Sequence, residues 1–180
     1  MPRLIAFLRA INVGGHIVKM EDLRRHFESL GFSGVETFIA SGNVVFETNA
    51  RSAAALEKKI ESRLRGALGY DVATFIRTDA ELVRIAEHEP FPKYSLATAV
   101  SLNIAFLAAS LDAGATRTLM ALETRDDDFH VRGREIYWLS RRKQSESTIS
   151  NAVFEKALGQ RSTLRGANTV KRMAAKYGGH

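Results

Sequence analysis

The sequence predicts an α+β fold made of two similar halves, and three observations lead to this prediction. Short apolar runs alternate with stretches in which apolar residues recur every three or four positions, as strands alternate with amphipathic helices. In the first half the order is strand, helix, strand, strand, helix, strand, and a similar order begins again after residue 90. Two of the three prolines, Pro90 and Pro92, lie between the halves, where a connector is expected.

The first half contains four expected strands and two expected helices. The run 4–11 is apolar except for Arg9 and ends near a Gly-Gly pair, which indicates a strand followed by a loop. Gly31 ends the next helix, and Gly42-Asn43 supplies a tight turn between the next two strands. We expect strands at 4–11, 35–39, 44–47 and 72–76, and helices at 20–30 and 56–68.

The second half follows a short helix at 79–88 and the proline-containing connector. Asp112 is placed to cap a helix, Gly133 to turn a hairpin and Gly159 to end a helix. We expect strands at 100–106, 129–132, 135–139 and 162–165, and helices at 112–122, 149–158 and 170–177.

This order of elements is that of the ferredoxin-like split unit (βαββαβ), in which the third strand lies between the first and the second. We therefore predict two tandem ferredoxin-like subdomains, at residues 1–88 and 89–180, with mixed, mostly antiparallel sheets and helices packed on them. The first strand is apolar on both faces, so both faces should be covered. Phe7 and Phe46 are then expected in the core, and not as the base-stacking aromatics of an open sheet.

Composition limits the classes of protein that the chain can represent. Its 180 residues are 45% hydrophobic, which is ample for a buried core. The absence of cysteine excludes disulfides, thiolate metal sites and thiol catalysis. Apolar runs are much shorter than the roughly 20 residues of a membrane helix. Because residues 1–4 enter a strand without a signal-peptide cleavage region, we expect a cytoplasmic protein that does not contact membranes.

Two short polar stretches, at 12–15 and 41–43, follow strands of the first half. A right-handed crossover makes the first and second strands parallel, so both stretches should emerge at one edge of the sheet. Asn12 and Asn43 are therefore expected to be neighbours. Gly and Asn also serve turns for backbone reasons alone, and that interpretation stays open. The candidate ligand-binding residues at this edge are Arg9, Asn12, Gly14, Gly15, Lys19, Ser41, Gly42 and Asn43.

The loop at this edge could bind an anion. A Gly-Gly loop that leads into a helix presents backbone N–H groups and the positive end of the helix dipole to a phosphate or carboxylate. Lys19 and His16 would add positive charge, and Arg9 could clamp an anion or pair with Glu36 or Glu47 across the sheet. The loop lacks both nucleotide-binding fingerprints, and the histidines lack metal-ligand spacing. The sequence therefore predicts neither a cofactor nor a metal site.

Net positive charge is confined to the second half. Residues 1–90 carry 12 basic and 12 acidic side chains, whereas residues 91–180 carry 14 and 8, which accounts for the net charge of +6. Clustered basic residues are what binding to a phosphate backbone requires, although a solvated basic surface has the same composition. The acidic run 126–128 is expected to be a solvated turn. The candidate polyanion-binding residues are Arg141, Arg142, Lys143, Arg165, Lys171 and Arg172.

Two segments carry a resemblance to a known family. Residues 7–15 (FLRAINVGG) and 38–46 (FIASGNVVF) closely resemble the two signatures of an uncharacterised bacterial family, catalogued as domain of unknown function 1697. The pairs Lys19-Met20 and Tyr137-Trp138 and the terminal segment 168–170 are also similar to its pattern. Where that family commonly has a Lys and an Asn-Trp pair, this chain has Thr148 and Gly166-Ala167. The resemblance implies the paired ferredoxin-like fold and brings no established activity.

Three classes of function fit these observations. The first is a binding protein for a small anionic, nucleotide-like ligand or for nucleic acid, with any nucleic-acid contact salt-sensitive and largely non-specific. The second is a small-molecule enzyme at the same edge, with His16 in acid–base work and Arg9 or Lys19 as charge stabilisers. The third is an interaction module whose basic face docks an acidic protein. The sequence identifies neither a reaction nor a protein partner.

Overall fold

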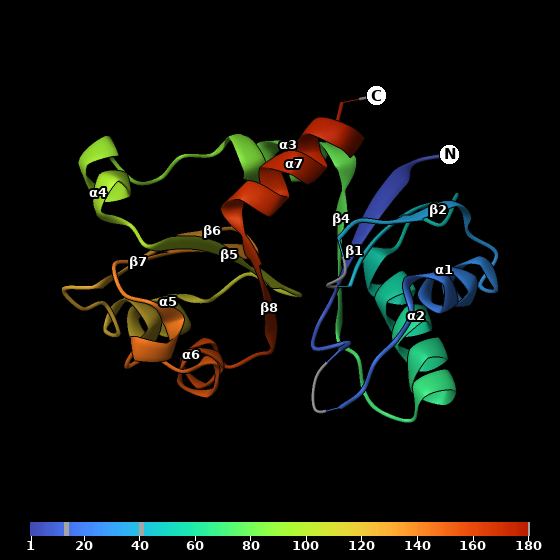
Figure 1. The fold of residues 1–180 in the computed structure, drawn as a ribbon, viewed down its shortest axis with the longest axis horizontal. Helices are drawn as coiled ribbons and strands as arrows, with labels where there is room; N and C mark the ends of the chain where they lie inside the picture. Colours follow the sequence, from blue (N-terminus) through green and yellow to red (C-terminus); the bar gives the residue numbers. More distant parts are fainter. Residues whose placement is uncertain (13–14, 40–41, 180) are drawn as a thin grey trace. The chain divides into compact units, whose positions relative to one another are not determined.

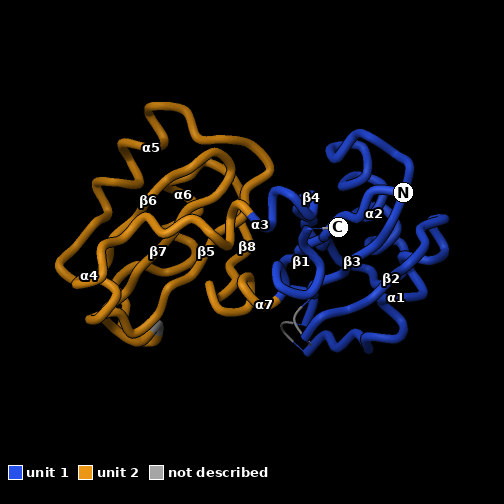
Figure 2. Tube along the Cα trace, turned by 90° about the horizontal axis from the view of Figure 1, so that it is seen from above, with its two compact units in different colours: residues 1–83, 173–180 blue, residues 84–172 orange. Residues whose placement is uncertain are grey.

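The computed structural model describes residues 1–12, 15–39 and 42–179, with the backbone alone for Gln144 (Figure 1). The chain forms two compact units, one of Met1–Val83 with Met173–His180 and the other of Arg84–Arg172 (Figure 2). In the described part of the chain, none of the helices has the length and apolar character needed to cross a membrane.

The unit boundaries differ from the predicted division at residue 88. Helices α3 (Asp79–Glu87) and α7 (Ala167–Tyr177) both run across the boundary between the units. The end of α7 belongs to the first unit, because Tyr177 contacts residues from the beginning of the chain. Its ring centroid lies 5.9 Å from that of Phe38, and its carbonyl oxygen accepts a hydrogen bond of 3.2 Å from Arg3 Nη1.

The first unit contains a four-stranded sheet in the order β2-β3-β1-β4. The third strand lies between the first and the second, as predicted. Every neighbouring pair is antiparallel. Strands β1 and β2 run in the same direction but are not neighbours, because β3 lies between them. The strands are β1 (Arg3–Leu8), β2 (Ser33–Thr37), β3 (Asn43–Glu47) and β4 (Thr74–Thr78).

Helices α1 (Met20–Glu28) and α2 (Ala53–Leu68) supply the apolar partners for this sheet. Alternate residues of β1 enter a core that also contains Phe27 of α1, Ile60 of α2 and Phe46 of β3. The rings of Phe27 and Phe46 lie 5.5 Å apart with an edge contact. Phe7, on the opposite face of β1, is also fully buried. Burial of one such side chain contributes about 1.5–3 kcal/mol, and neither Phe7 nor Phe46 is open to a stacking base.

The second unit repeats this topology with the sheet order β6-β7-β5-β8. Asp112 caps a helix as predicted, because its Oδ1 accepts a 2.7 Å hydrogen bond from the Ala115 amide. Helices α5 and α6 contribute to the core on the face of the sheet that carries Ala105 and Trp138. The elements are α4 (Lys93–Thr98), β5 (Ser101–Leu107), α5 (Ala113–Met120), β6 (Asp127–Arg132), β7 (Glu135–Ser140), the 3₁₀ helix η1 (Gln144–Glu146), α6 (Asn151–Leu158) and β8 (Ser162–Gly166).

Most element bounds differ from the prediction by a few residues; the first strand ends earlier than predicted, and one helix is additional. The first strand ends at Leu8, whereas its apolar run continues to residue 11, because Ala10 takes a left-handed backbone (φ 53°) that a strand cannot contain. Helix α4 was not predicted. It begins directly after Pro92, whose fixed φ is compatible with a helix start, although prolines in a connector suggest a loop.

Candidate functional site

The loop after β1 is held by hydrogen bonds at both of its described ends. Asn12 Oδ1 accepts a hydrogen bond of 2.8 Å from the Val18 amide. Tyr70 Oη, beyond the end of α2, donates to the Ile11 carbonyl oxygen at 2.8 Å, and its ring lies 4.1 Å from that of His16. The Asn12 carboxamide therefore joins the two ends of this loop. Val13 and the predicted ligand residue Gly14 lie outside the described residues.

The turn between β2 and β3 depends on Gly42 and Asn43. Gly42 has a φ of 77°, and a Cβ at this position would lie 3.0 Å from both Leu8 Cβ and Ile11 Cγ2. Only glycine meets both requirements without strain. Asn43 is fully buried, and its Nδ2 donates to the Phe38 carbonyl oxygen at 2.9 Å. Ala40 and the predicted ligand residue Ser41 lie outside the described residues.

These two segments meet, as the crossover argument predicts. The Leu8 amide donates to the Gly42 carbonyl oxygen at 2.8 Å, and Gly42 packs beside Ile11, the residue before Asn12. Both asparagine side chains, however, bond within their own segments. The turn interpretation of these residues therefore has direct support, while their role in ligand binding stays a prediction.

Each segment contains a non-glycine residue with a left-handed backbone. Ala10 has a φ of 53° and Ile39 a φ of 55°. Such a conformation costs about 1–3 kcal/mol per residue and persists only where its surroundings enforce it, most often near functional sites. For β-branched Ile39 it is especially unusual. Alanine and isoleucine rarely adopt this backbone conformation, so the residue types at positions 10 and 39 did not predict it.

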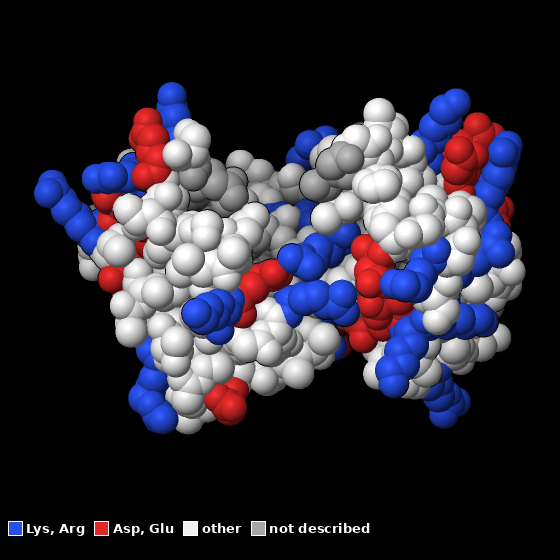
Figure 3. Space-filling model, turned by 90° about the horizontal axis from the view of Figure 1, so that it is seen from below, with Lys and Arg blue, Asp and Glu red and all other residues white. Residues whose placement is uncertain are grey.

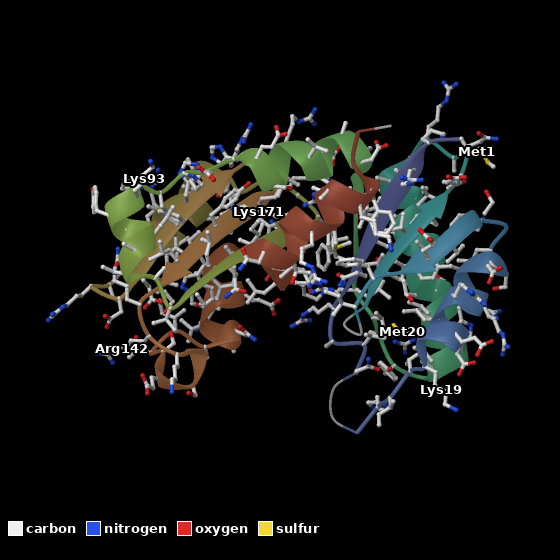
Figure 4. All side chains as sticks on the ribbon, turned by 45° about the horizontal axis from the view of Figure 1, so that its top comes forward. Met1, Lys19, Met20, Lys93, Arg142 and Lys171 are labelled. Carbon is white, nitrogen blue, oxygen red and sulfur yellow. The ribbon has the colours of Figure 1, made fainter. Side chains whose placement is uncertain are left out.

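Positive charge at this edge comes from Arg9 and Lys19. Lys19, labelled in Figure 4, is the N-cap residue of α1. Its side chain makes no capping hydrogen bond, so it satisfies none of the amides of the first helical turn. Glu21, in that turn, pairs with Arg25 at 2.8 Å. The backbone amide of half-buried Arg9 donates to Ala73 at 2.9 Å.

The pairing of Arg9 with Glu47 that the sequence left open is not favoured. Glu47 lies opposite Arg3 in the β1–β3 register, and the Arg3 Nη2 to Glu47 Oε1 distance is 4.0 Å. This ion pair lies at the opposite end of β1 from Arg9.

The edge also exposes two large apolar side chains that the sequence analysis missed. Ile17 is 85% exposed and lies in the loop before α1, and Ile39 is 43% exposed at the β2–β3 turn. Gly15, in the same loop as Ile17, is exposed with a φ of 85°. The edge thus combines positive charge with exposed apolar surface.

Three of the six predicted polyanion-binding residues lie close to acidic side chains. Arg141 pairs with Asp128 at 2.9 Å and Arg142 with Asp126 at 2.6 Å, so the acidic run is not a free solvated turn. Lys171 lies 3.9 Å from Glu89. Figure 3 shows acidic side chains interspersed with basic ones on the face in view. Ion pairing reduces the positive potential that these residues offer to a polyanion.

Arg165 differs from the other predicted polyanion-binding residues because it is buried. Its Nη1 donates to Thr163 Oγ1 at 2.7 Å and to the Leu164 carbonyl oxygen at 2.9 Å. Burial lowers the pKa of Arg165 to about 10, which leaves the guanidinium charged at neutral pH. The two remaining predicted residues, Lys143 and Arg172, lie on the loop after β7 and on α7.

A histidine pair in the second unit had no signal in the sequence. His88 Nε2 and His130 Nε2 lie 3.1 Å apart, and both rings approach Tyr137. Burial lowers the pKa of each histidine, and the positive charge of Arg132 lowers it further. Among the described residues, no group of three or more His, Cys, Asp or Glu side chains could hold a metal ion.

The fold defines a class of α+β proteins built from two ferredoxin-like units, each with a four-stranded antiparallel sheet. The model of a family described as Protein of unknown function (DUF1697) matches residues 1–137, and the chain belongs to this family. The matched range includes residues 7–15 and 38–46 and ends before Thr148 and Gly166.

A search of the curated proteins found no match. Among solved structures, the conserved bacterial protein SP0830 from Streptococcus pneumoniae is similar, with 22% sequence identity, a TM-score of 0.72 and coverage of 97% of each chain. At this identity the likeness shows the fold alone.

Proposed function

We propose that this protein binds a small anionic ligand of nucleotide-like character at the edge of the first unit. The residues concerned are those of the loop after β1 and of the β2–β3 turn, and Gly14 and Ser41 remain part of the proposal from the sequence. The positive charge of Arg9 and Lys19 would attract the anion. The exposed side chains of Ile17 and Ile39 would favour a ligand that also has an apolar part.

One observation carries the proposal: two segments with left-handed backbone at Ala10 and Ile39 are held together where Gly42 packs against Leu8. Ordinary turns would use glycine or asparagine at such positions and avoid the cost. An edge with strained backbone beside the N-terminus of α1 is suited to holding a ligand in one geometry.

Calorimetric titration with pyrophosphate and with AMP tests the proposal. Lys19 is exposed and makes no cap hydrogen bond, so Lys19→Ala should leave the fold intact and weaken binding about 3- to 10-fold, as expected for loss of one charge near a helix N-terminus. Lys58→Ala removes an exposed lysine from α2 of the same unit and serves as the matched control. The proposal is overturned if neither probe binds, or if both variants bind as the wild type does.

The two alternatives have weaker support. Nucleic-acid binding would need the basic residues of the second unit, of which Arg141 and Arg142 are ion-paired and Arg165 is buried. Single-stranded RNA titrated across a salt series would reveal it as a steep loss of affinity with salt. Catalysis would need a partner for His16, and no hydrogen bond joins His16 to another described residue.

A further inference from the structure

Residues 85–91, which form the end of α3 and lead towards α4, lie on one face of the sheet in the second unit. His130 and Tyr137 stand opposite each other on that face, because the register of β6 and β7 pairs them. Trp138, the neighbour of Tyr137, points to the other face, which belongs to the core shared with α5 and α6. The 85–91 segment therefore covers the face of the sheet opposite to α5 and α6.

Two polar contacts join the 85–91 segment to the sheet. Tyr137 Oη donates a hydrogen bond of 2.7 Å to the Ile85 carbonyl oxygen. Burial raises the pKa of the Tyr137 hydroxyl, so this bond does not titrate in the acid range. The second contact lies between His88 Nε2 and His130 Nε2, which are 3.1 Å apart. This distance is that of a hydrogen bond between one donor and one acceptor nitrogen.

Packing between the 85–91 segment and the sheet is incomplete. A cavity of about 50 Å³ remains beneath the segment, which is room for about three water molecules. Its walls are mainly apolar and include Phe91, Leu96, Leu102 and Ile104. A void removes dispersion contacts that a closely packed segment would make. The two polar contacts therefore supply a larger share of the attachment than they would above a filled core.

The His88–His130 contact depends on the number of protons that the two rings carry. Between two nitrogen atoms 3.1 Å apart there is room for one hydrogen atom. The contact forms when both rings are neutral, and it survives one added proton, because an imidazolium can still donate to a neutral ring. A second proton would place an N–H group on each Nε2 atom and set two positive charges side by side. The doubly protonated pair is therefore incompatible with this geometry.

The charges around the two rings also oppose a second proton. Arg132 follows on the same face of β6, and burial together with its positive charge lowers the pKa of both histidines. Glu135 lies opposite Arg132 in the β6–β7 register. Glu89, the residue after His88, lies 3.9 Å from Lys171 of α7. Both carboxylates near the histidine pair thus already have a basic neighbour.

We propose that the His88–His130 contact is a proton-sensitive latch, which holds the 85–91 segment on the sheet at neutral pH and releases it when both rings are protonated. Release would also break the hydrogen bond from Tyr137 and uncover the apolar walls of the cavity. The latch belongs to the second unit alone and does not depend on the anion site proposed for the first unit.

Hydrogen–deuterium exchange of the wild-type protein at pH 7.5 and pH 5.0, corrected for the intrinsic effect of pH, tests the proposal. A peptide that covers 84–91 contains the His88 amide, which donates to the Arg84 carbonyl oxygen at 3.2 Å. Its amides should lose about tenfold or more of their protection at pH 5.0, because each unit of pKa difference changes an equilibrium tenfold. Unchanged protection of this peptide overturns the proposal.

A second peptide separates local release from unfolding of the whole unit. Strand β5 lies between β7 and β8 in the sheet, so its amides exchange only when the sheet opens. At pH 5.0 they should remain at least about tenfold better protected than those of 84–91. Equal protection of the two peptides at pH 5.0 would mean that the unit unfolds as a whole, and it would contradict a latch.

The double variant His88→Gln/His130→Gln keeps polar side chains but cannot take up these protons. Protection of 84–91 in this variant should no longer fall between pH 7.5 and pH 5.0. His26→Gln is the matched control, because burial and the charge of Arg63 also lower the pKa of His26, which lies on α1 of the first unit. The control should keep the wild-type response. A double variant that also keeps it overturns the proposal.

Tyr137→Phe keeps the buried ring and removes only the hydrogen bond to the Ile85 carbonyl oxygen. Protection of 84–91 should fall at both pH values in this variant, because one of the two polar contacts is lost. Its further fall between pH 7.5 and pH 5.0 should remain, because the histidine pair is intact. Loss of the pH response in Tyr137→Phe would show that the histidines are not the groups that release the segment.

Discussion

Gly42 and Leu8 are in direct contact: the Leu8 amide donates to the Gly42 carbonyl oxygen at 2.8 Å, and a Cβ at Gly42 would lie 3.0 Å from Leu8 Cβ. This contact joins the β2–β3 turn to the end of β1. The end of β1 and Gly42 are therefore held together by close packing as well as by a hydrogen bond.

Gly42→Ala should lower the free energy of unfolding by about 2–4 kcal/mol, because it combines a left-handed backbone with overpacking against Leu8 and Ile11. Urea denaturation measures this change. Gly15→Ala is the matched control, since its φ is 85° but a Cβ there would meet nothing within 4 Å. The control should cost only about 1 kcal/mol. Equal losses for the two variants would show that the contact with Leu8 contributes nothing.

Asn43→Ala should also destabilise the first unit. The variant leaves the Phe38 carbonyl oxygen without its 2.9 Å hydrogen bond and opens a gap at a fully buried position. We expect a loss of about 1–3 kcal/mol in chemical denaturation. Asn49→Ala changes an exposed asparagine just after β3 and should cost less than about 0.5 kcal/mol. Wild-type stability of Asn43→Ala would contradict a structural role for Asn43.

Adjacent aspartates in the second unit should differ sharply. Asp127 accepts hydrogen bonds from Trp138 Nε1 at 2.9 Å and from Thr124 Oγ1 at 2.9 Å, and it is buried. Asp127→Ala should therefore cost about 2–4 kcal/mol and shift the emission of the single tryptophan. Asp126→Ala removes only the ion pair with half-exposed Arg142 and should cost at most about 1 kcal/mol. Similar losses of stability for both variants would show that the indole bond is unimportant.

Sequence reasoning succeeded where local patterns set the structure. The order of helices and strands along the chain, together with the crossover rule, predicted the strand order of the sheets. The presence of a glycine at position 42 predicted the turn there. Sequence reasoning failed where distant residues determine the outcome. Nothing near Tyr177 indicates that this residue meets Phe38, and nothing near His88 indicates His130.

The predicted sites show the same limit. Arg165 resembles a surface cation in the sequence, but the β5–β8 register directs it into the protein, where it bonds Thr163. Asn103 and Gly166 are more than 60 residues apart in the sequence, and only the β5–β8 register places them opposite each other. Residue type alone could not have revealed either arrangement.

The His88–His130 pair should make the stability of the second unit depend on pH. Burial, Arg132 and, for His88, the neighbouring His130 lower the pKa values below the ordinary value of 6.5, so the unfolded chain binds protons more readily than the folded one. The stabilisation is fully present above about pH 6.5 and is lost as the pH falls through the lower folded pKa values. Urea denaturation of the wild type from pH 8 to pH 5 should show stability falling with acidity. In the double variant His88→Gln/His130→Gln this decline should be shallower, whereas His16→Gln, at an exposed position in the first unit, should retain it. A double variant with the wild-type pH profile would mean that these two histidines are not the groups that titrate.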